Sequence, residues 1–285
     1  MEVDFGIIKK AEEKNLEDIL IAEKKEWEEM SLPQRFVRKL KNIFIRSHDF
    51  RDNDFKVKSD KSQRPKIAVY SCIVGDYDKV IEPNFEFKNV DYILFTDEKI
   101  KSEKWKVLPV PDNCKQKSSV LTNRYIKMHP YEIFGEEYEY SIYIDGNIKV
   151  VGDVTPMTYV VEKLGLALHR HSMRDDIRKE VYACISQKKG NKQKLLEQLN
   201  DYKRGGFPKR FGMLECNVIV ARLDNDKARE ILNDWWKEFI RSGSMRDQIS
   251  LPYVIWKKGY TIDDIGNLGY NVYRNPKLRK MEHKK

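Results

Sequence analysis

The chain has 285 residues and a formal net charge of +9, with 54 Lys and Arg against 45 Asp and Glu. Hydrophobic residues make up 40% and aromatic residues 11%, a composition that excludes a disordered chain and indicates a globular protein. Its apolar runs stay well short of the roughly 20 residues that span a bilayer, and the N-terminus lacks the zones of a secretory signal. We therefore expect a cytoplasmic protein.

Residues 1–64 differ in pattern from the rest of the chain. Apolar side chains recur at helical spacing over residues 16–27, and a second amphipathic helix with one basic face follows Pro33. Such a basic helix can pack its apolar face on the domain or lie on an anionic membrane surface. We expect a helical extension and linker over 1–64, with a peripheral position at the inner face of the membrane as the alternative.

From residue 65 onward, short apolar runs alternate with helical patterns. Strands are predicted over 66–74, 91–97, 141–151 (with a tight turn inside), 165–171 and 215–222, and helices over 119–134 and around 195–202 and 228–239. This alternation predicts an α/β fold with a mostly parallel central sheet flanked by helices. The domain is placed at 65–275, and residues 276–285 are set apart as a basic tail.

In open α/β sheets, ligands bind beyond the carboxyl ends of the strands, so polar residues there are the candidate site residues. A tyrosine-rich strand runs directly into Asp145, Gly146 and Asn147. Two oxygen ligands at a strand end can hold a hard cation that bridges the phosphates of a nucleotide. A simple hairpin turn favours the same three residue types, so both interpretations stay open here.

Two further segments suit a nucleotide. The first predicted strand opens into a loop that can offer backbone amides to phosphate and an aromatic ring to a base; it contains Val74, Gly75, Asp76 and Tyr77. Asp97 ends the next strand and is a candidate contact for the nucleoside. Arg124 and Lys127 lie three residues apart, so they share a helix face and can reach one diphosphate, although a solvated face explains them equally.

The remaining candidates lie later in the chain. His169 and His171 alternate along a predicted strand, with Arg174 beyond; they are candidate acceptor-binding residues, and a structural role is favoured for His169. Glu215 and Asn217 fall on one face where a strand begins. Asp247 and Gln248 precede an apolar helix, where Asp247 can be a catalytic carboxylate or a helix cap.

Taken in order, the motifs YIDGNIKV, ECNVIVAR and RDQISLPYV resemble those of the glycosyltransferase-like family once called domain of unknown function 616. That family contains plant mucilage-related proteins and one labelled a ceramidase, and the resemblance covers roughly residues 66–260. More distantly, the layout is similar to that of family 8 glycosyltransferases, which carry an Asp-x-Asp after a Tyr-rich strand and an Asp-Gln pair before a helix.

The resemblance implies a GT-A fold, a nucleotide-sugar donor and a Mn²⁺ or Mg²⁺ ion. It places Asp145 and Asn147 at the metal and diphosphate, and Asn217, Asp247 and Gln248 at the sugar and acceptor. The second acid of Asp-x-Asp is Asn147 here, a weaker ligand. Metal binding then rests on Asp145 with His171, or basic residues replace the metal.

The sequence thus predicts a glycosyltransferase that moves a sugar, most simply from a UDP-sugar, to a glycan or lipid-linked acceptor. Asp247 and Glu215 are the candidate catalytic residues, and bacterial surface polysaccharide synthesis is the setting that the resemblance suggests. A nucleic-acid-binding module is the first alternative, but aromatic residues are not interleaved with basic ones as stacking platforms require. A hydrolase is the second; the Gly-x-Ser-x-Gly and His-Glu-x-x-His motifs are missing.

Overall fold

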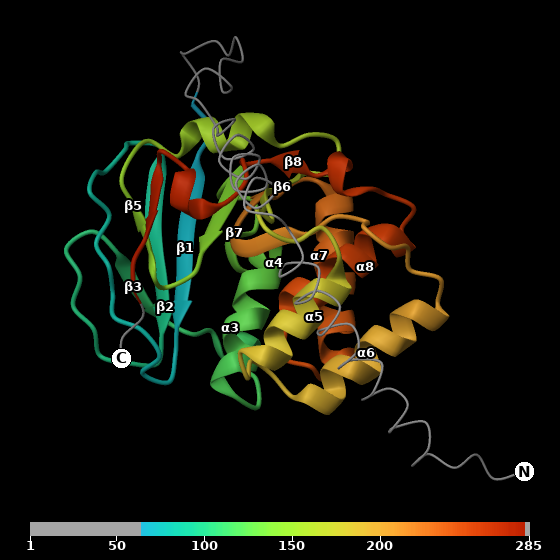
Figure 1. The fold of residues 1–285 in the computed structure, drawn as a ribbon. Helices are drawn as coiled ribbons and strands as arrows, with labels where there is room; N and C mark the ends of the chain where they lie inside the picture. Colours follow the sequence, from blue (N-terminus) through green and yellow to red (C-terminus); the bar gives the residue numbers. More distant parts are fainter. Residues whose placement is uncertain (1–63, 283–285) are drawn as a thin grey trace, which may run out of the picture. The chain divides into compact units, whose positions relative to one another are not determined.

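The computed structural model describes residues 64–282, so the helices predicted within 1–64 lie outside the described residues. In this part of the chain, seven strands form the central sheet in the order β3-β2-β1-β4-β7-β6-β8 (Figure 1). Their bounds are β1 (Ile67–Ile73), β2 (Val90–Thr96), β3 (Lys106–Pro109), β4 (Tyr140–Ile144), β6 (Leu166–Arg170), β7 (Leu214–Arg222) and β8 (Gly266–Asn267).

The sheet is mostly parallel. β1 pairs in parallel with β2 and β4, and β2 with β3, whereas β7 runs antiparallel between β4 and β6. Every residue of β1 is buried, which explains its continuous apolar sequence: a central parallel strand is covered on both faces. The α/β class and the mostly parallel sheet predicted from the sequence are therefore confirmed.

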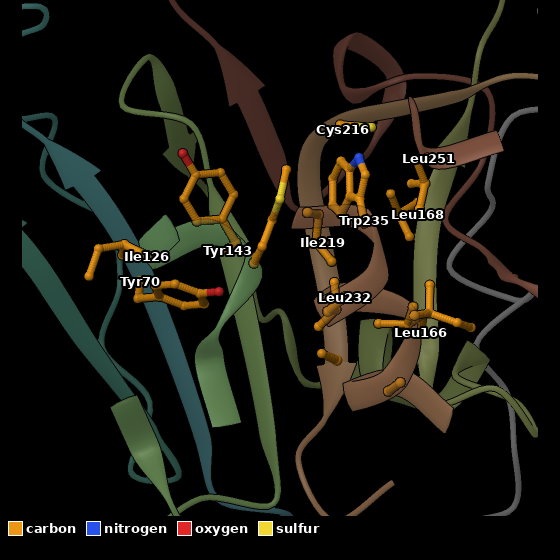
Figure 2. Close-up of a cluster of buried hydrophobic side chains, with 14 of the residues drawn as sticks. Tyr70, Ile126, Tyr143, Leu166, Leu168, Cys216, Ile219, Leu232, Trp235 and Leu251 are labelled. Atoms are coloured by element: carbon orange, nitrogen blue, oxygen red, sulfur yellow. The ribbon is translucent and has the colours of Figure 1, made fainter. Parts of the chain in front are cut away.

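Helices cover one face of this sheet. They are α3 (Ser119–Met128), α4 (Pro130–Phe134), α5 (Ile177–Ser186), α6 (Lys192–Arg204), α7 (Asp226–Ser242) and α8 (Asp247–Lys257). Figure 2 shows Trp235 and Leu232 of α7 packed beside strand residues such as Leu168 and Ile219 in the main core. The predicted helix over 119–134 is two helices, because Pro130 disfavours helical backbone at His129 and cannot donate the next hydrogen bond.

The opposite face of the sheet carries a different cover. A two-stranded antiparallel sheet of β5 (Ile148–Val150) and β9 (Leu278–Lys280) packs there with the 3-10 helix η3 (Thr155–Val160). Three further 3-10 turns are η2 (Asp112–Cys114), η4 (Ile262–Asp264) and η5 (Val272–Arg274). Among residues 64–282, none of the helices is long and apolar enough to cross a membrane.

Residues 276–282, set apart above as the start of a tail, belong to this packed unit. Leu278 is buried with Ile148 and Val150, and it adds apolar area to the second core. Beyond it, the Met281 amide donates to the Asn147 carbonyl at 2.8 Å, and the Asn147 side chain donates back to the Met281 carbonyl. The tail prediction missed these residues because a three-residue strand carries too little periodicity to be seen among basic residues.

Replacing Leu278 by Ala should lower the free energy of unfolding by about 2–4 kcal/mol, because it empties a buried site between β9 and the sheet. Met281→Ala is the matched control, since Met281 is exposed and its backbone bonds persist; it should change stability by less than about 0.5 kcal/mol. Urea unfolding of both variants measures the difference. Equal stabilities would show that β9 is not part of the folded unit.

Candidate functional site

The polar residues predicted from the sequence gather at one edge of the sheet. The carboxyl ends of β1, β2, β4 and β6 meet there with the amino end of β7, because β7 alone of these strands runs in the opposite direction. Directly beyond β4, the Asp145 amide donates to the Asn217 carbonyl at 2.9 Å, and beyond β6 the His171 amide donates to the Met213 carbonyl at 2.9 Å.

The loop after β1 is held by acidic side chains. Gly75 and Asp76 both have left-handed backbone, with φ of 71° and 54°. The Gly75 amide donates to both oxygens of Asp97 at 3.0 and 3.2 Å, and the Asp76 amide donates to Glu98 at 2.9 Å. These two amides, predicted to meet phosphate, already have carboxylate partners, whereas the ring of Tyr77 is 68% exposed beside them.

A buried ion cluster lies behind this edge. The Lys127 ammonium is 2.6 Å from Oδ2 of Asp247 and 3.9 Å from Oδ1 of Asp145, and Nε of Arg124 is 3.0 Å from the same oxygen of Asp247. One turn of α3 separates the two cations, and Asp247 is the first residue of α8. The sequence assigned Arg124, Lys127 and Asp145 to the diphosphate and Asp247 to catalysis; the structure brings all four together.

Electrostatics fixes the protonation state of Asp247. Burial alone would raise the pKa of its carboxyl, but the neighbouring Arg124 and Lys127 charges outweigh burial and hold the pKa well below its usual range. Its backbone carbonyl also accepts a hydrogen bond from the Trp235 indole at 2.9 Å. Asp247 is thus a fixed anion and a very weak base at neutral pH.

Asn123 joins the cluster to the sheet, and the sequence analysis did not select it. Its amide nitrogen donates to the Cys72 carbonyl at 2.6 Å, and its oxygen accepts from the Arg124 guanidinium. The Tyr143 hydroxyl lies 3.4 Å from the same oxygen. An asparagine is a poor residue for a helix interior, and this was the available signal that Asn123 has a specific partner.

Glu215 and Asn217 share one side of β7, as their spacing predicted. The Asn217 amide nitrogen is 3.4 Å from Oε2 of Glu215. Burial raises the pKa of Glu215 to about 7, against the smaller lowering effects of the Asn217 amide and the Lys280 charge. Glu215 is therefore balanced between acid and carboxylate near neutral pH, in contrast to Asp247.

The histidines occupy unlike environments. A register irregularity between Leu168 and His169 precedes both histidines, and the side chains around the two rings differ. His169 is fully buried; its Nε2 lies 3.1 Å from the Asn275 amide, and burial lowers its pKa to about 3. It fits the structural role favoured above and not a contact with an acceptor.

His171 follows β6 and lies beside Glu180 of α5. Its Nδ1 accepts from the backbone amides of Met173 and Arg174 at 3.2 and 3.1 Å, so in the neutral ring Nε2 carries the hydrogen and faces Glu180 at 3.7 Å. Burial and the Arg174 charge lower the pKa of His171 to about 4, and Arg174 itself is paired with Glu180. Neither ring nitrogen offers a lone pair to a metal in this arrangement.

Two of the metal ligands predicted from the sequence have hydrogen-bond partners within the protein. Asn147 is buried and its amide is bonded to Met281, while His171 has the partners just described. Within residues 64–282, no group of three or more His, Cys, Asp or Glu side chains is arranged around a metal position. Asp145 has 34% of its side chain exposed. One carboxylate suffices where substrate phosphates complete the coordination, as is usual for Mg²⁺.

Gln248 follows Asp247 at the start of α8, and its backbone amide donates to Oδ1 of Asp247 at 3.0 Å. The charges of Arg124, Lys127, Asp145 and Asp247 sum to zero. The cluster by itself therefore offers no net positive charge to a diphosphate, although its members are placed at the edge where a ligand would bind.

The charged cluster thus lies at the edge where open α/β sheets bind their ligands. Residues 22–283 match the model of the TOD1/MUCI70, glycosyltransferase-like domain, and the chain belongs to this family. This confirms the resemblance drawn from the sequence motifs. A search of curated proteins finds no match. Among solved structures, mouse xyloside xylosyltransferase 1 in its apo form aligns at 10% identity and a TM-score of 0.40, covering 70% of this chain and 83% of that one.

Lys127→Met should lower the free energy of unfolding by about 3–5 kcal/mol, because it removes one partner of a buried carboxylate. Lys117→Met is the control: Lys117 is exposed, and its loss should cost less than about 0.5 kcal/mol. Adding Asp247→Asn should restore part of the stability lost in Lys127→Met, since the uncompensated charge is then gone. Strictly additive effects in this double-mutant cycle would contradict the pairing.

Proposed function

We propose that this protein is a glycosyltransferase that uses a nucleotide-sugar, most simply a UDP-sugar, bound across the carboxyl edge of β1, β2 and β4. The observation that carries the proposal is the ordered cluster of Asp145, Lys127, Arg124 and Asp247 at this edge. Membership of a glycosyltransferase-like family supports it. A GT-A type of donor site is the corresponding structural proposal.

The donor is seated by three features of the edge. Tyr77 presents an exposed ring to the base, and Asp97 with Val74 and Gly75 shapes the loop beneath it. The diphosphate lies by Asp145 and Gly146. Because the neighbouring ion cluster is neutral, a Mn²⁺ or Mg²⁺ ion held by Asp145 and the diphosphate oxygens would neutralise the leaving group.

In this proposal, Arg124 and Lys127 position the two carboxylates of the cluster and do not contact the diphosphate. Lys127 is buried and Arg124 is partly buried against Asp247, so they orient that carboxylate toward the donor sugar and hold Asp145 at the sheet edge. Asp247 is a positioning residue in this account and not the base, because its pKa lies far below neutrality and its oxygens already face two cations. This revises the first choice of catalytic carboxylate made from the sequence.

Glu215 is the base that the geometry favours. It lies at the same edge, next to Asn217, and its pKa of about 7 matches the pKa that efficient general bases have. The acceptor hydroxyl gives its proton to the Glu215 carboxylate while its oxygen bonds to the anomeric carbon. The bond from that carbon to the diphosphate breaks, and the diphosphate leaves with the electron pair.

The acceptor approaches from the β6 and β7 side of the edge. Asn217 and Gln248 would contact the sugars, and Arg174 adds positive charge close to Glu215. The acceptor is a glycan or a lipid-linked glycan, and we place the protein in the cytoplasm, at the inner face of the membrane, in bacterial surface polysaccharide synthesis. These are proposals that follow the sequence motifs.

A thermal-shift screen of UDP, GDP, CDP and their sugar conjugates, each with Mn²⁺, Mg²⁺ or EDTA, tests donor binding. A nucleotide at 100 times its dissociation constant should stabilise the fold by about 2.7 kcal/mol. Asp145→Ala should abolish the shift, and Glu136→Ala, an exposed acid before β4, should leave it intact. No shift with any nucleotide would contradict the proposal, and an equal shift in EDTA would contradict the metal.

The pH dependence of transfer tests Glu215. Its pKa is raised to about 7, so the reactive carboxylate is absent at pH 5 and present at pH 8. The initial rate should therefore rise through about pH 7 and level off, and Glu215→Gln should reduce kcat by about 100-fold or more. Glu136→Gln should keep the wild-type profile. A Glu215→Gln enzyme with the wild-type rate and profile would eliminate Glu215 as the base.

A further inference from the structure

The small sheet of β5 and β9 leads away from the candidate site with a basic outer face. Its inner residues Ile148, Val150 and Leu278 are buried against the central sheet. Alternation then turns Lys149 and Arg279 outward, and the two are direct cross-strand partners. We define the basic ribbon as β5 and β9 together with Arg274 and Lys277.

The ribbon is unusual because two of its cations, Lys149 and Arg279, lie directly opposite one another. Like charges directly opposite one another across two strands destabilise a sheet. Within residues 64–282, most exposed cations of the helices pair with an acid, yet Lys149 and Arg279 form no ion pair in that range. The ribbon contains five basic residues, namely Lys149, Arg274, Lys277, Arg279 and Lys280. The surface is therefore complementary to a polyanion.

Exposed aromatic rings border the same surface. Tyr273 in η5 is 69% exposed, and the Lys280 ammonium lies 5.1 Å from its ring centre. On the other border, the Asn84 amide donates to the Val150 carbonyl at the outer edge of β5, and the neighbouring Phe85 is 53% exposed. Aromatic rings that stay exposed beside several cations are typical of a binding surface and not of a merely solvated one.

The ribbon is continuous with the candidate site. β5 begins one residue after the Gly146–Asn147 turn that follows Asp145, and the Met281 amide after β9 donates to the Asn147 carbonyl at 2.8 Å. Lys280 is close enough to Glu215 for its charge to act on that carboxyl. A chain whose reacting hydroxyl lies at Glu215 would therefore pass Lys280 and Tyr273 and continue along Lys149 and Arg279.

We propose that the basic ribbon binds the body of a polyanionic glycan acceptor, one that carries carboxylate or phosphate groups along its length. This inference rests on the proposed function and names its acceptor class. The continuity with Glu215 favours a glycan over a membrane, because a membrane would need a broad flat face and gains nothing from leading into the site. The Tyr273 ring stacks on a sugar, and the Lys149 and Arg279 charges meet the anionic groups.

The test is fluorescence anisotropy with a short, labelled polyuronate oligosaccharide and a neutral maltooligosaccharide of equal length. Wild type should bind the polyuronate, less tightly as salt is raised, and should not bind the neutral probe. The double variant Lys149→Glu, Arg279→Glu should bind about ten-fold more weakly, since two attractive contacts become repulsive. Tyr273→Ala should weaken binding as well.

Lys189→Glu, Lys227→Glu is the matched control, because it makes the same change in net charge at exposed residues of the helical layer and should bind like wild type. Equal weakening in both double variants, or equal binding by the ribbon variant and wild type, would overturn the inference. Binding to phosphatidylglycerol vesicles but not to the oligosaccharide would also overturn it, in favour of a membrane surface.

Thermal shifts with the nucleotide donor, measured on the same variants, separate this inference from the proposed function. If all variants respond to the donor but none depends on the ribbon for polyuronate binding, the ribbon inference fails and the transferase proposal stands. If none responds to any donor, the proposed function fails, whatever the ribbon binds.

Discussion

The arrangement of the candidate site depends on one buried ion cluster, in which Asp247 faces both Arg124 and Lys127. The two cations come from α3 and the carboxylate from the first residue of α8, so the cluster fixes both helices relative to the sheet. Breaking such a buried pair is costly, whereas its intact form adds little net stability over apolar packing. Its retention in the core is best explained by what it positions, namely Asp145 at the end of β4.

The same burial has opposite consequences for the two carboxylates proposed for the chemistry. Asp247 is buried with two cations, so it stays ionised and unreactive toward protons. Glu215 is partly buried beside an amide and has only more distant charges, so its pKa rises to about 7 and it can exchange a proton near neutrality. Pairs of acids whose surroundings separate their pKa values are a general mark of divided catalytic roles.

Much of the sheet could be predicted from the sequence, because β1, β2 and β7 are buried runs whose composition and length leave little alternative. The reversed direction of β7 could not, since apolar runs carry no information about strand direction. The short strands β3 and β9 and the helix α5 were missed; their patterns are too brief or too polar for periodicity to detect.

The sequence predicted which residues form the site better than it predicted the contacts between them. Arg124, Lys127, Asp145 and Asp247 were all selected, but their mutual pairing depends on how α8 packs beside α3, which no local pattern encodes. Alternation placed Glu215 and Asn217 correctly on one side, but it could not show that His169 and His171 have different partners. Asn147 is predicted from the sequence as a metal ligand, and the bond from its side-chain nitrogen to Met281, 134 residues away, is a contact that no local pattern encodes.

The central claim is that a nucleotide-sugar occupies the carboxyl edge of β1 and β4. Amide hydrogen exchange by mass spectrometry, with and without UDP and Mn²⁺, tests this directly. The account predicts slower exchange in two separate segments, residues 74–77 and 145–147, with little change in α6 and α7. Unchanged exchange in both segments, or protection confined to surfaces away from this edge, would contradict it.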